Sequence, residues 1–174
     1  MNSSSFFLAA PLATSSFARL MPSAILFALL LFLPLAEFDG ESNILIFNLF
    51  GVESGIPDGA VPFSKWFSLP VLVLGITAML LSGYLAMGLF RAIKLVQFVK
   101  LHKMARISII VMVAWIALTF AFYIPTIAKS IVGLDDIIYK VGAFLPLAAL
   151  VLTIAATSGL KKDIKKVRST DRIR

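Results

Sequence analysis

Four long apolar stretches, separated by polar segments, set the pattern of this chain. They cover residues 20–37, 66–90, 107–128 and 141–160, and charged residues stand at or beside the ends of each. A helix needs roughly 20 mostly apolar residues to cross the hydrocarbon of a bilayer, where the backbone has to satisfy its own hydrogen bonds. Each stretch is therefore predicted to be a membrane-spanning helix.

The predicted fold is all-α, an integral membrane four-helix bundle, because short connections after the second and third helices favour antiparallel neighbours. In the first helix, Pro22 fits the first turn, whereas Pro34 is predicted to bend or end the helix near its far end. Residues 38–65 are predicted to form an outer loop, because their apolar run at 44–50 is too short to span and Gly and Pro follow it. This loop either covers the bundle and touches the interface, or is a lid or partner-docking surface.

The composition supports a chain surrounded by lipid. Hydrophobic residues make up 60% of the 174 residues and charged residues 14%, whereas about 25% of residues are charged in an average soluble domain. The length allows a single domain. The chain has no cysteine, which excludes disulfides, thiolate nucleophiles, iron–sulfur clusters and cysteine zinc sites.

The charges are divided between the two sides of the predicted bundle, and the net charge is +7. The acids gather in the outer loop and before the fourth helix, whereas most basic residues flank the opposite ends of the helices. Lys and Arg beside spans stay on the cytoplasmic side, so both termini are predicted to be cytoplasmic. The residues predicted to contact the membrane surface, its lipids or a partner are Arg91, Lys94, Lys100, Lys103, Arg106, Lys161, Lys162, Lys165, Lys166, Arg168, Arg172 and Arg174.

Residues 161–174 are predicted to be a basic cytoplasmic tail, with Ile164, Val167 and Ile173 on one loose apolar stripe of a helix. Such a segment is expected to lie along the anionic inner leaflet, where each Lys or Arg contributes ~1 kcal/mol. A docking site for an acidic partner is the alternative. Nucleic acid is not an expected partner, because the tail lacks aromatic and groove-reading elements.

Residues 1–19 are predicted to be an N-terminal extension, rich in Ser and uncharged before Arg19. A signal peptide begins with a basic region. The extension is therefore expected to escape cleavage and to be interfacial or loosely ordered.

Candidate chemical groups are scarce. The four stretches contain no ionisable residue at mid-depth, although ion paths through membranes depend on such groups. Glu37 stands at the outer edge of the first helix and is expected to face water. The single histidine, His102, falls in a predicted basic cytoplasmic loop, on the other side from Asp135 and Asp136, which excludes a Ser-His-Asp triad. The sequence predicts no catalytic residue, no metal site and no cofactor.

Small residues recur at helix-packing spacing in the second and fourth helices. Small side chains four residues apart let helices approach closely. These contacts are expected within the chain, with contacts to another subunit as the alternative. The residues predicted to serve helix packing are Gly75, Ser82, Gly83, Ala86, Ala155 and Gly159.

Two stretches carry a resemblance to a known family. The end of the chain runs from Leu145 (LPLAALVL) to Leu160-Lys-Lys-Asp and closes with Val167-Arg-Ser and Asp171-Arg-Ile-Arg, and the first helix holds Leu31-Phe-Leu-Pro-Leu-Ala. The chain thus resembles the bacterial family known as domain of unknown function 4293, small four-span membrane proteins mainly of Bacteroidota. The resemblance implies four spans and a place in the bacterial inner membrane.

These observations favour a non-catalytic integral inner-membrane protein that is an accessory, scaffold or assembly subunit of a larger membrane complex. Its expected partners are membrane lipids, including anionic inner-leaflet lipids, and other integral membrane subunits. The alternative is a small transporter or channel for an uncharged or lipid-like substrate. A membrane enzyme acting at the inner surface through His102 and the basic loop is a third class, which is disfavoured because no acid or nucleophile is expected on that side to pair with the histidine.

Overall fold

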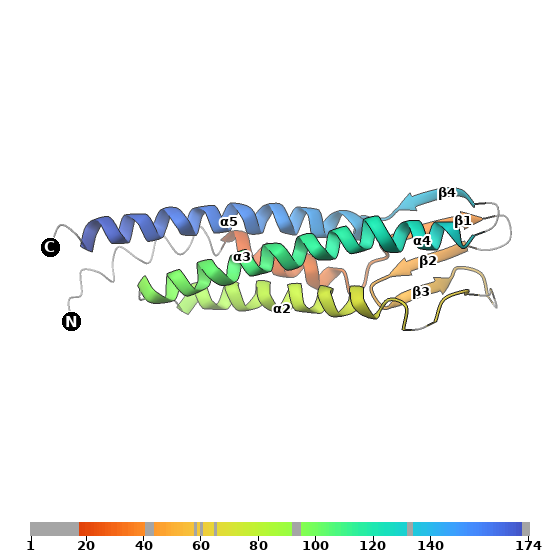
Figure 1. Ribbon diagram of the computed structural model, residues 1–174, viewed down its shortest axis with the longest axis horizontal. Helices are drawn as coiled ribbons and strands as arrows, with labels where there is room; N and C mark the ends of the chain where they lie inside the picture. The colour runs from red at the N-terminus through yellow and green to blue at the C-terminus, as the bar shows by residue number, and fades with distance from the viewer. Residues whose placement is uncertain are drawn as a thin grey trace.

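A bundle of helices carries a small antiparallel sheet at one end (Figure 1). The computed structural model describes residues 18–40, 44–57, 59, 61–64, 66–91, 95–131 and 134–171. The helices are the N-terminal helix Ala18–Leu29, α2 Leu69–Arg91, α3 Leu95–Leu118, the π-helix η1 Thr119–Tyr123, α4 Ile124–Lys129 and α5 Val141–Asp171. The strands are β1 Ala36–Gly40, β2 Ile44–Asn48, β3 Gly51–Ser54 and β4 Leu134–Tyr139.

Three helical stretches in the described part of the chain are long and apolar enough to cross a membrane: Leu69–Leu89, Val96–Lys129 and Val141–Lys165. Large apolar side chains cover their outer faces, and Leu80 and Ile110 are 63% and 67% exposed. A soluble monomer rarely leaves a wide apolar surface in water. The helices and their surface therefore suggest a membrane protein.

The prediction of an all-α fold holds only in part: the described chain is mostly helical, but it also contains a small antiparallel sheet, because the first apolar stretch does not remain helical to its end. Its helix ends at Leu29, and turns lead from there into β1. Pro34 has no N–H to donate to the carbonyl of Leu30, and it disfavours helical backbone in the residue before it. In place of the span predicted at 20–37, the described helix is about 18 Å long at 1.5 Å per residue.

The strands form one antiparallel sheet in the order β3-β2-β1-β4, and the first three lie in or beside the predicted outer loop 38–65. Ala36 and Phe38 of β1 pair with Phe47 and Leu45 of β2, and all four are at most 1% exposed. Alternate residues of a strand face opposite sides of a sheet. These four side chains therefore form the inner face of the sheet.

The turn between β2 and β3 has a local cause. Asn48 pairs with Gly51 across the hairpin, which leaves a two-residue loop. The side-chain Oδ1 of Asn48 accepts hydrogen bonds from the backbone N–H groups of Phe50 (3.0 Å) and Gly51 (2.8 Å). Asn favours turns because its side chain can replace a backbone acceptor in this way.

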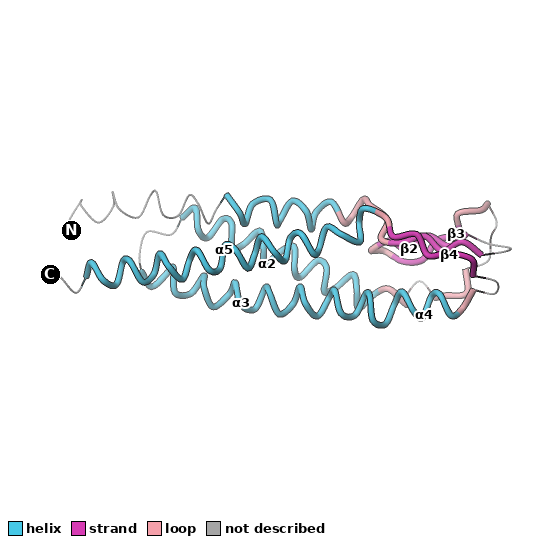
Figure 2. Tube along the Cα trace, turned by 90° about the horizontal axis from the view of Figure 1, so that it is seen from above, coloured by secondary structure: helices cyan, strands magenta, loops and turns pink. Residues whose placement is uncertain are grey.

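The inner face of the sheet is covered by the helical segment of η1 and α4, which runs alongside the sheet (Figure 2). Ile124 and Ile127 are 3% and 0% exposed and share one hydrophobic cluster with Phe38 and Phe47. The Phe47 ring also stacks on the Tyr123 ring, with centroids 6.0 Å apart. The sheet is therefore an integral part of the core.

The third helix begins earlier than predicted, whereas its end at Lys129 lies within one residue of the predicted end. The segment 91–106, predicted to be a loop, is helical where the structure describes it, because α2 ends at Arg91 and α3 begins at Leu95. At the other end, η1 carries the helix past Pro125, which has no N–H to donate. The Ile124 N–H donates to the Thr119 carbonyl five residues back, and this wider turn keeps the helix continuous.

The fourth helix also exceeds its prediction, since α5 runs straight into the predicted tail at 161–174 (Figure 1). Leu160 is 2% exposed, and Ile164 packs against the same cluster, which includes Phe98 of α3. The apolar stripe of the tail thus holds its first turn against the bundle as a continuation of α5.

Candidate functional site

The end of the bundle away from the sheet is basic. Half of the residues predicted to contact lipid or a partner have described side chains, and all of these are exposed. They are Lys100, Lys103 and Arg106 on α3, and Lys161, Lys162 and Lys165 on α5. The side chains of Arg91, Lys94, Lys166, Arg168, Arg172 and Arg174 lie outside the described part.

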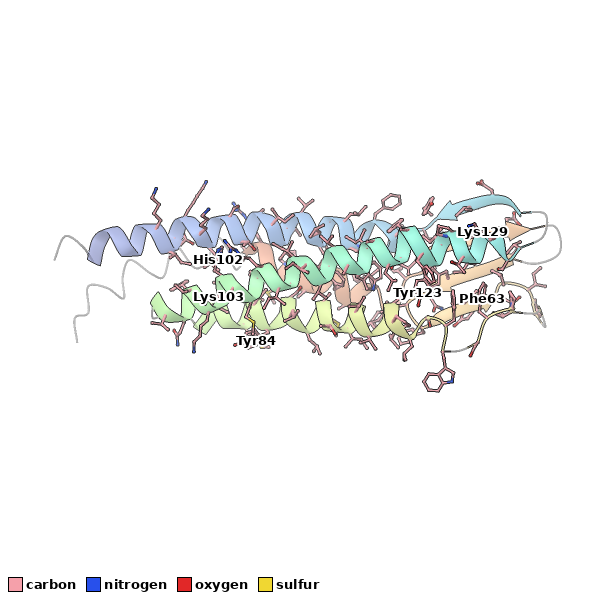
Figure 3. All side chains as sticks on the ribbon, viewed as in Figure 1. Phe63, Tyr84, His102, Lys103, Tyr123 and Lys129 are labelled. Carbon is pink, nitrogen blue, oxygen red and sulfur yellow. The ribbon has the colours of Figure 1, made fainter. Side chains whose placement is uncertain are left out.

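A groove of about 610 Å³ opens at this end between the last turns of α2 and the first turns of α3. Its walls include Met87 and Ile107, which are 61% and 47% exposed. Lys100, Lys103 and Tyr84 also line it, and Figure 3 shows Tyr84 and Lys103 in the same part of the bundle, on neighbouring helices. The groove thus combines apolar walls with two cations.

The glycine at the floor of this groove explains how closely α2 and α3 approach. A Cβ on Gly88 would lie 2.5 Å from Cδ2 of Leu101, which is 5% exposed. A larger residue at this position would force the Leu101 side chain to shift, so the glycine lets Leu101 rest against α2 in its observed position. The contact links the two walls of the groove.

Two titratable side chains at the basic end are covered by the fold. His102 is half-buried on α3, between α3 and α5 (Figure 3), and its Nδ1 is buried without a hydrogen-bond partner among the described atoms. The prediction of a solvated loop histidine is therefore wrong, because helical backbone turns this side chain inward. Asp163 of α5 is 7% exposed, so an acid at this end is also covered, which the sequence pattern did not reveal. Where the chain is described, no three His, Asp or Glu side chains form a group that could hold a metal ion.

Among the predicted helix-packing residues, Gly75 of α2 is tightly packed. A Cβ there would lie 3.0 Å from Cδ1 of Leu49 and 3.1 Å from Nε1 of Trp115. Ser82 and Ala86, on the same helix, are 0% and 6% exposed. These positions lie where α2 faces the rest of the bundle.

Gly83 differs from this group. A Cβ on Gly83 would meet no atom of the described residues within 4 Å, so Gly83 is not a close-packing position within this part of the chain. On α5, Ala155 and Gly159 are half-buried, and the Ala155 carbonyl accepts a hydrogen bond from Nη1 of Arg19 at 3.3 Å. This bond ties the start of the N-terminal helix to α5.

Sequence reasoning did not single out Trp115, which is fully buried in the bundle. Its side chain is 0% exposed, and Nε1 donates a 2.9 Å hydrogen bond to the Val71 carbonyl of α2. Tyr123 likewise donates to the Phe67 carbonyl at 2.7 Å. Two aromatic side chains of the third helix thus anchor the start of α2.

The sheet end carries several acids, and one of them, Glu37, forms an ion pair. Glu37 Oε2 lies 2.5 Å from Nζ of Lys140, so the carboxylate at the edge of the first apolar stretch is held by the residue before α5. Glu37 pairs with Ile46 on one side and Ile138 on the other. This row lies on the outward face of the sheet, because its neighbours Ala36 and Phe38 face inward.

Comparison with known proteins identifies a family for this chain. A family model, Domain of unknown function (DUF4293), matches residues 20–173. This match confirms the family resemblance noted in the first helix and the tail. No curated protein and no solved structure matches the chain.

Proposed function

The chain belongs to the family Domain of unknown function (DUF4293), and on this premise we propose that it is a non-catalytic integral membrane protein of the bacterial inner membrane. Its role is that of an accessory, scaffold or assembly subunit of a larger membrane complex. In this proposal the helices lie in the bilayer, the sheet lies outside it, and the sheet binds another subunit of the complex.

The proposed placement in the membrane follows from the two ends of the bundle. The uncharged residues 141–160 of α5 span about 30 Å at 1.5 Å per residue, which equals the thickness of the hydrocarbon layer. An open sheet edge is not tolerated in hydrocarbon, because its N–H and C=O groups would have no partner. The sheet is therefore placed outside the lipid, and the basic end on the cytoplasmic side.

Close packing at the centre of the bundle favours a structural role and disfavours a transport function. Side chains from α2, α3, η1 and α5 fill it, and each of the following is 0% exposed: Ala78, Ser82, Met112, Trp115, Thr119, Ala149 and Thr153. A transporter or channel for an uncharged or lipid-like substrate needs space at this depth. This second candidate therefore has less support than a scaffold.

The outward face of the sheet is the observation that carries the proposal. Ile138 is 41% exposed, Ile46 and Glu37 lie beside it in one cross-strand row, and Asp136 is exposed on the same strand. Exposed apolar side chains with polar residues around them follow the layout of protein interfaces, in which an apolar centre is surrounded by a polar rim. Its proposed partner is the extramembrane part of another membrane subunit.

Quantitative interaction mass spectrometry on the native protein, purified in mild detergent, tests this proposal. We expect a defined set of membrane proteins to copurify with the wild type and to be lost from the Ile138→Gln variant. Ile56→Gln is the matched control, because Ile56 is also 41% exposed but lies beyond β3. Recovery of the wild type only as a monomer or homo-oligomer would contradict the proposal, as would equal losses in the two variants.

A further inference from the structure

The groove between α2 and α3 has the shape and the chemistry of a lipid site. It lies at the basic end and is about 610 Å³ in volume. Met87, Met104 and Ile107 provide apolar walls that are exposed on the outer surface of the helices. An apolar groove that opens sideways from a membrane bundle can be entered by an acyl chain directly from the bilayer.

The apolar surface continues from the groove toward the sheet. On α2, Leu80 and Ile76 are 63% and 37% exposed, one and two turns before Tyr84, and Ile110 of α3 is 67% exposed next to the groove residue Ile107. Residues three or four apart lie on one face of a helix. An acyl chain that enters the groove therefore has a continuous apolar track along both helices.

The other end of the groove is suited to an anion. Lys100 and Lys103 line it and are exposed, and no acid is among the described residues that line the groove. Tyr84 stands close to the level of Lys103 (Figure 3) and adds a hydroxyl that can donate a hydrogen bond. Lysines attract lipid phosphates at the surface of an anionic leaflet.

We propose that this groove binds one anionic phospholipid of the inner leaflet. Its phosphate is held by Lys100 and Lys103, and one acyl chain lies against Met87, Met104 and Ile107. The inference rests on the proposed placement of the basic end in the cytoplasmic leaflet, and it does not depend on the partner of the sheet. A site in a groove is selective, whereas a diffuse basic surface attracts anionic lipid at every exposed lysine.

Native mass spectrometry of the full chain in detergent, titrated with phosphatidylglycerol or phosphatidylcholine, measures this binding. We expect one phosphatidylglycerol to bind tightly and phosphatidylcholine to bind at least about tenfold more weakly, given the contribution of a lysine at an anionic surface. The double variant K100Q/K103Q is expected to lose about tenfold or more in affinity for phosphatidylglycerol. The matched control K162Q/K165Q removes two exposed lysines of α5 at the same end and is expected to stay within about twofold of the wild type.

A second variant tests the apolar part of the groove without changing its charge. Met104→Trp fills the groove, so we expect it to lose the bound lipid while its unfolding midpoint stays close to that of the wild type. Glycerol phosphate, which has the anion but no acyl chain, is expected not to displace the lipid. Equal losses in the two lysine pairs, equal affinity for the two lipids, or displacement by glycerol phosphate would overturn the proposal. These titrations use the purified chain alone. A negative result would therefore refute lipid binding by the groove without bearing on whether the sheet binds a protein partner.

Discussion

The contact between Gly75 and Trp115 offers the sharpest test of how the bundle is packed. In Gly75→Ala, the new Cβ would lie 3.1 Å from Nε1 of Trp115 and 3.0 Å from Cδ1 of Leu49, both closer than ordinary contacts. Overpacking of this kind costs roughly 1–3 kcal/mol, and the loss of the hydrogen bond from Trp115 to Val71 costs about 1 kcal/mol more. The better helix propensity of Ala offsets roughly 1 kcal/mol of this loss in the free energy of unfolding. The expected net destabilisation is about 1–3 kcal/mol.

Gly83→Ala is the matched control on the same helix. A Cβ there meets no atom of the described part of the chain within 4 Å, so only the propensity gain of up to about 1 kcal/mol remains. The two variants are thus expected to differ by roughly 2–4 kcal/mol in the free energy of unfolding.

Tryptophan fluorescence during unfolding by sodium dodecyl sulfate measures this difference. The chain has two tryptophans, and Trp66 is 76% exposed, so a Trp66→Phe background leaves the buried Trp115 as the reporter. We expect Gly75→Ala to unfold at lower detergent fraction and to show red-shifted emission before unfolding. Equal stability of the two alanine variants would refute the packing of α2 against the third helix at this point.

Three further variants test the sheet end. Glu37→Gln removes the partner of Lys140 and should cost less than about 1 kcal/mol in an unfolding titration, since the pair is partly exposed; a larger loss would contradict this. Asn48→Ala removes the acceptor for two backbone N–H groups of the β2–β3 turn and should cost about 1–2 kcal/mol in the same assay. Gly142→Ala would place a Cβ against the backbone carbonyl of Pro34, which cannot move as a side chain can, so we expect low yields of folded protein in size-exclusion chromatography; a normal yield would refute this close approach.

Sequence reasoning located the three long helices because their apolar residues form uninterrupted stretches bounded by charge. It underestimated the lengths of the third and fourth helices at the basic end, where Lys and Arg stand among the apolar residues. Those side chains are good helix formers and can face outward, as Lys100 and Lys103 do. The change from apolar to basic residues therefore did not mark the end of a helix. It marked the point at which the helix begins to carry exposed, charged side chains.

The sheet was missed for a different physical reason. A half-buried strand is recognised by alternation of apolar and polar residues, but β2 carries Ile44 and Ile46 on its outer face as well as Leu45 and Phe47 on its inner face. Apolar residues on both faces of β2 therefore hid the alternation. In addition, β4, which pairs with β1, is far away in the sequence, so the pairing has no local signal. The turn residues Asn48 and Gly51 were the one local signal.

The groove could not be predicted from the sequence either. It depends on α2 and α3 meeting at Gly88 and Leu101, a pairing of positions that apolar stretches alone do not specify. The sequence did predict that the basic residues along its rim contact lipid or a partner. What the fold adds is the apolar cavity beside two of them.

The central claim is that the helices cross a membrane with the sheet on one side and the basic end on the other. Because the chain has no cysteine, single variants Asp39→Cys in β1 and Lys162→Cys in α5, both at exposed positions, report one side each. A membrane-impermeant maleimide added to intact spheroplasts should label Asp39→Cys at once and label Lys162→Cys only after the membrane is opened. Labelling of both before opening, or of Lys162→Cys alone, would contradict the account.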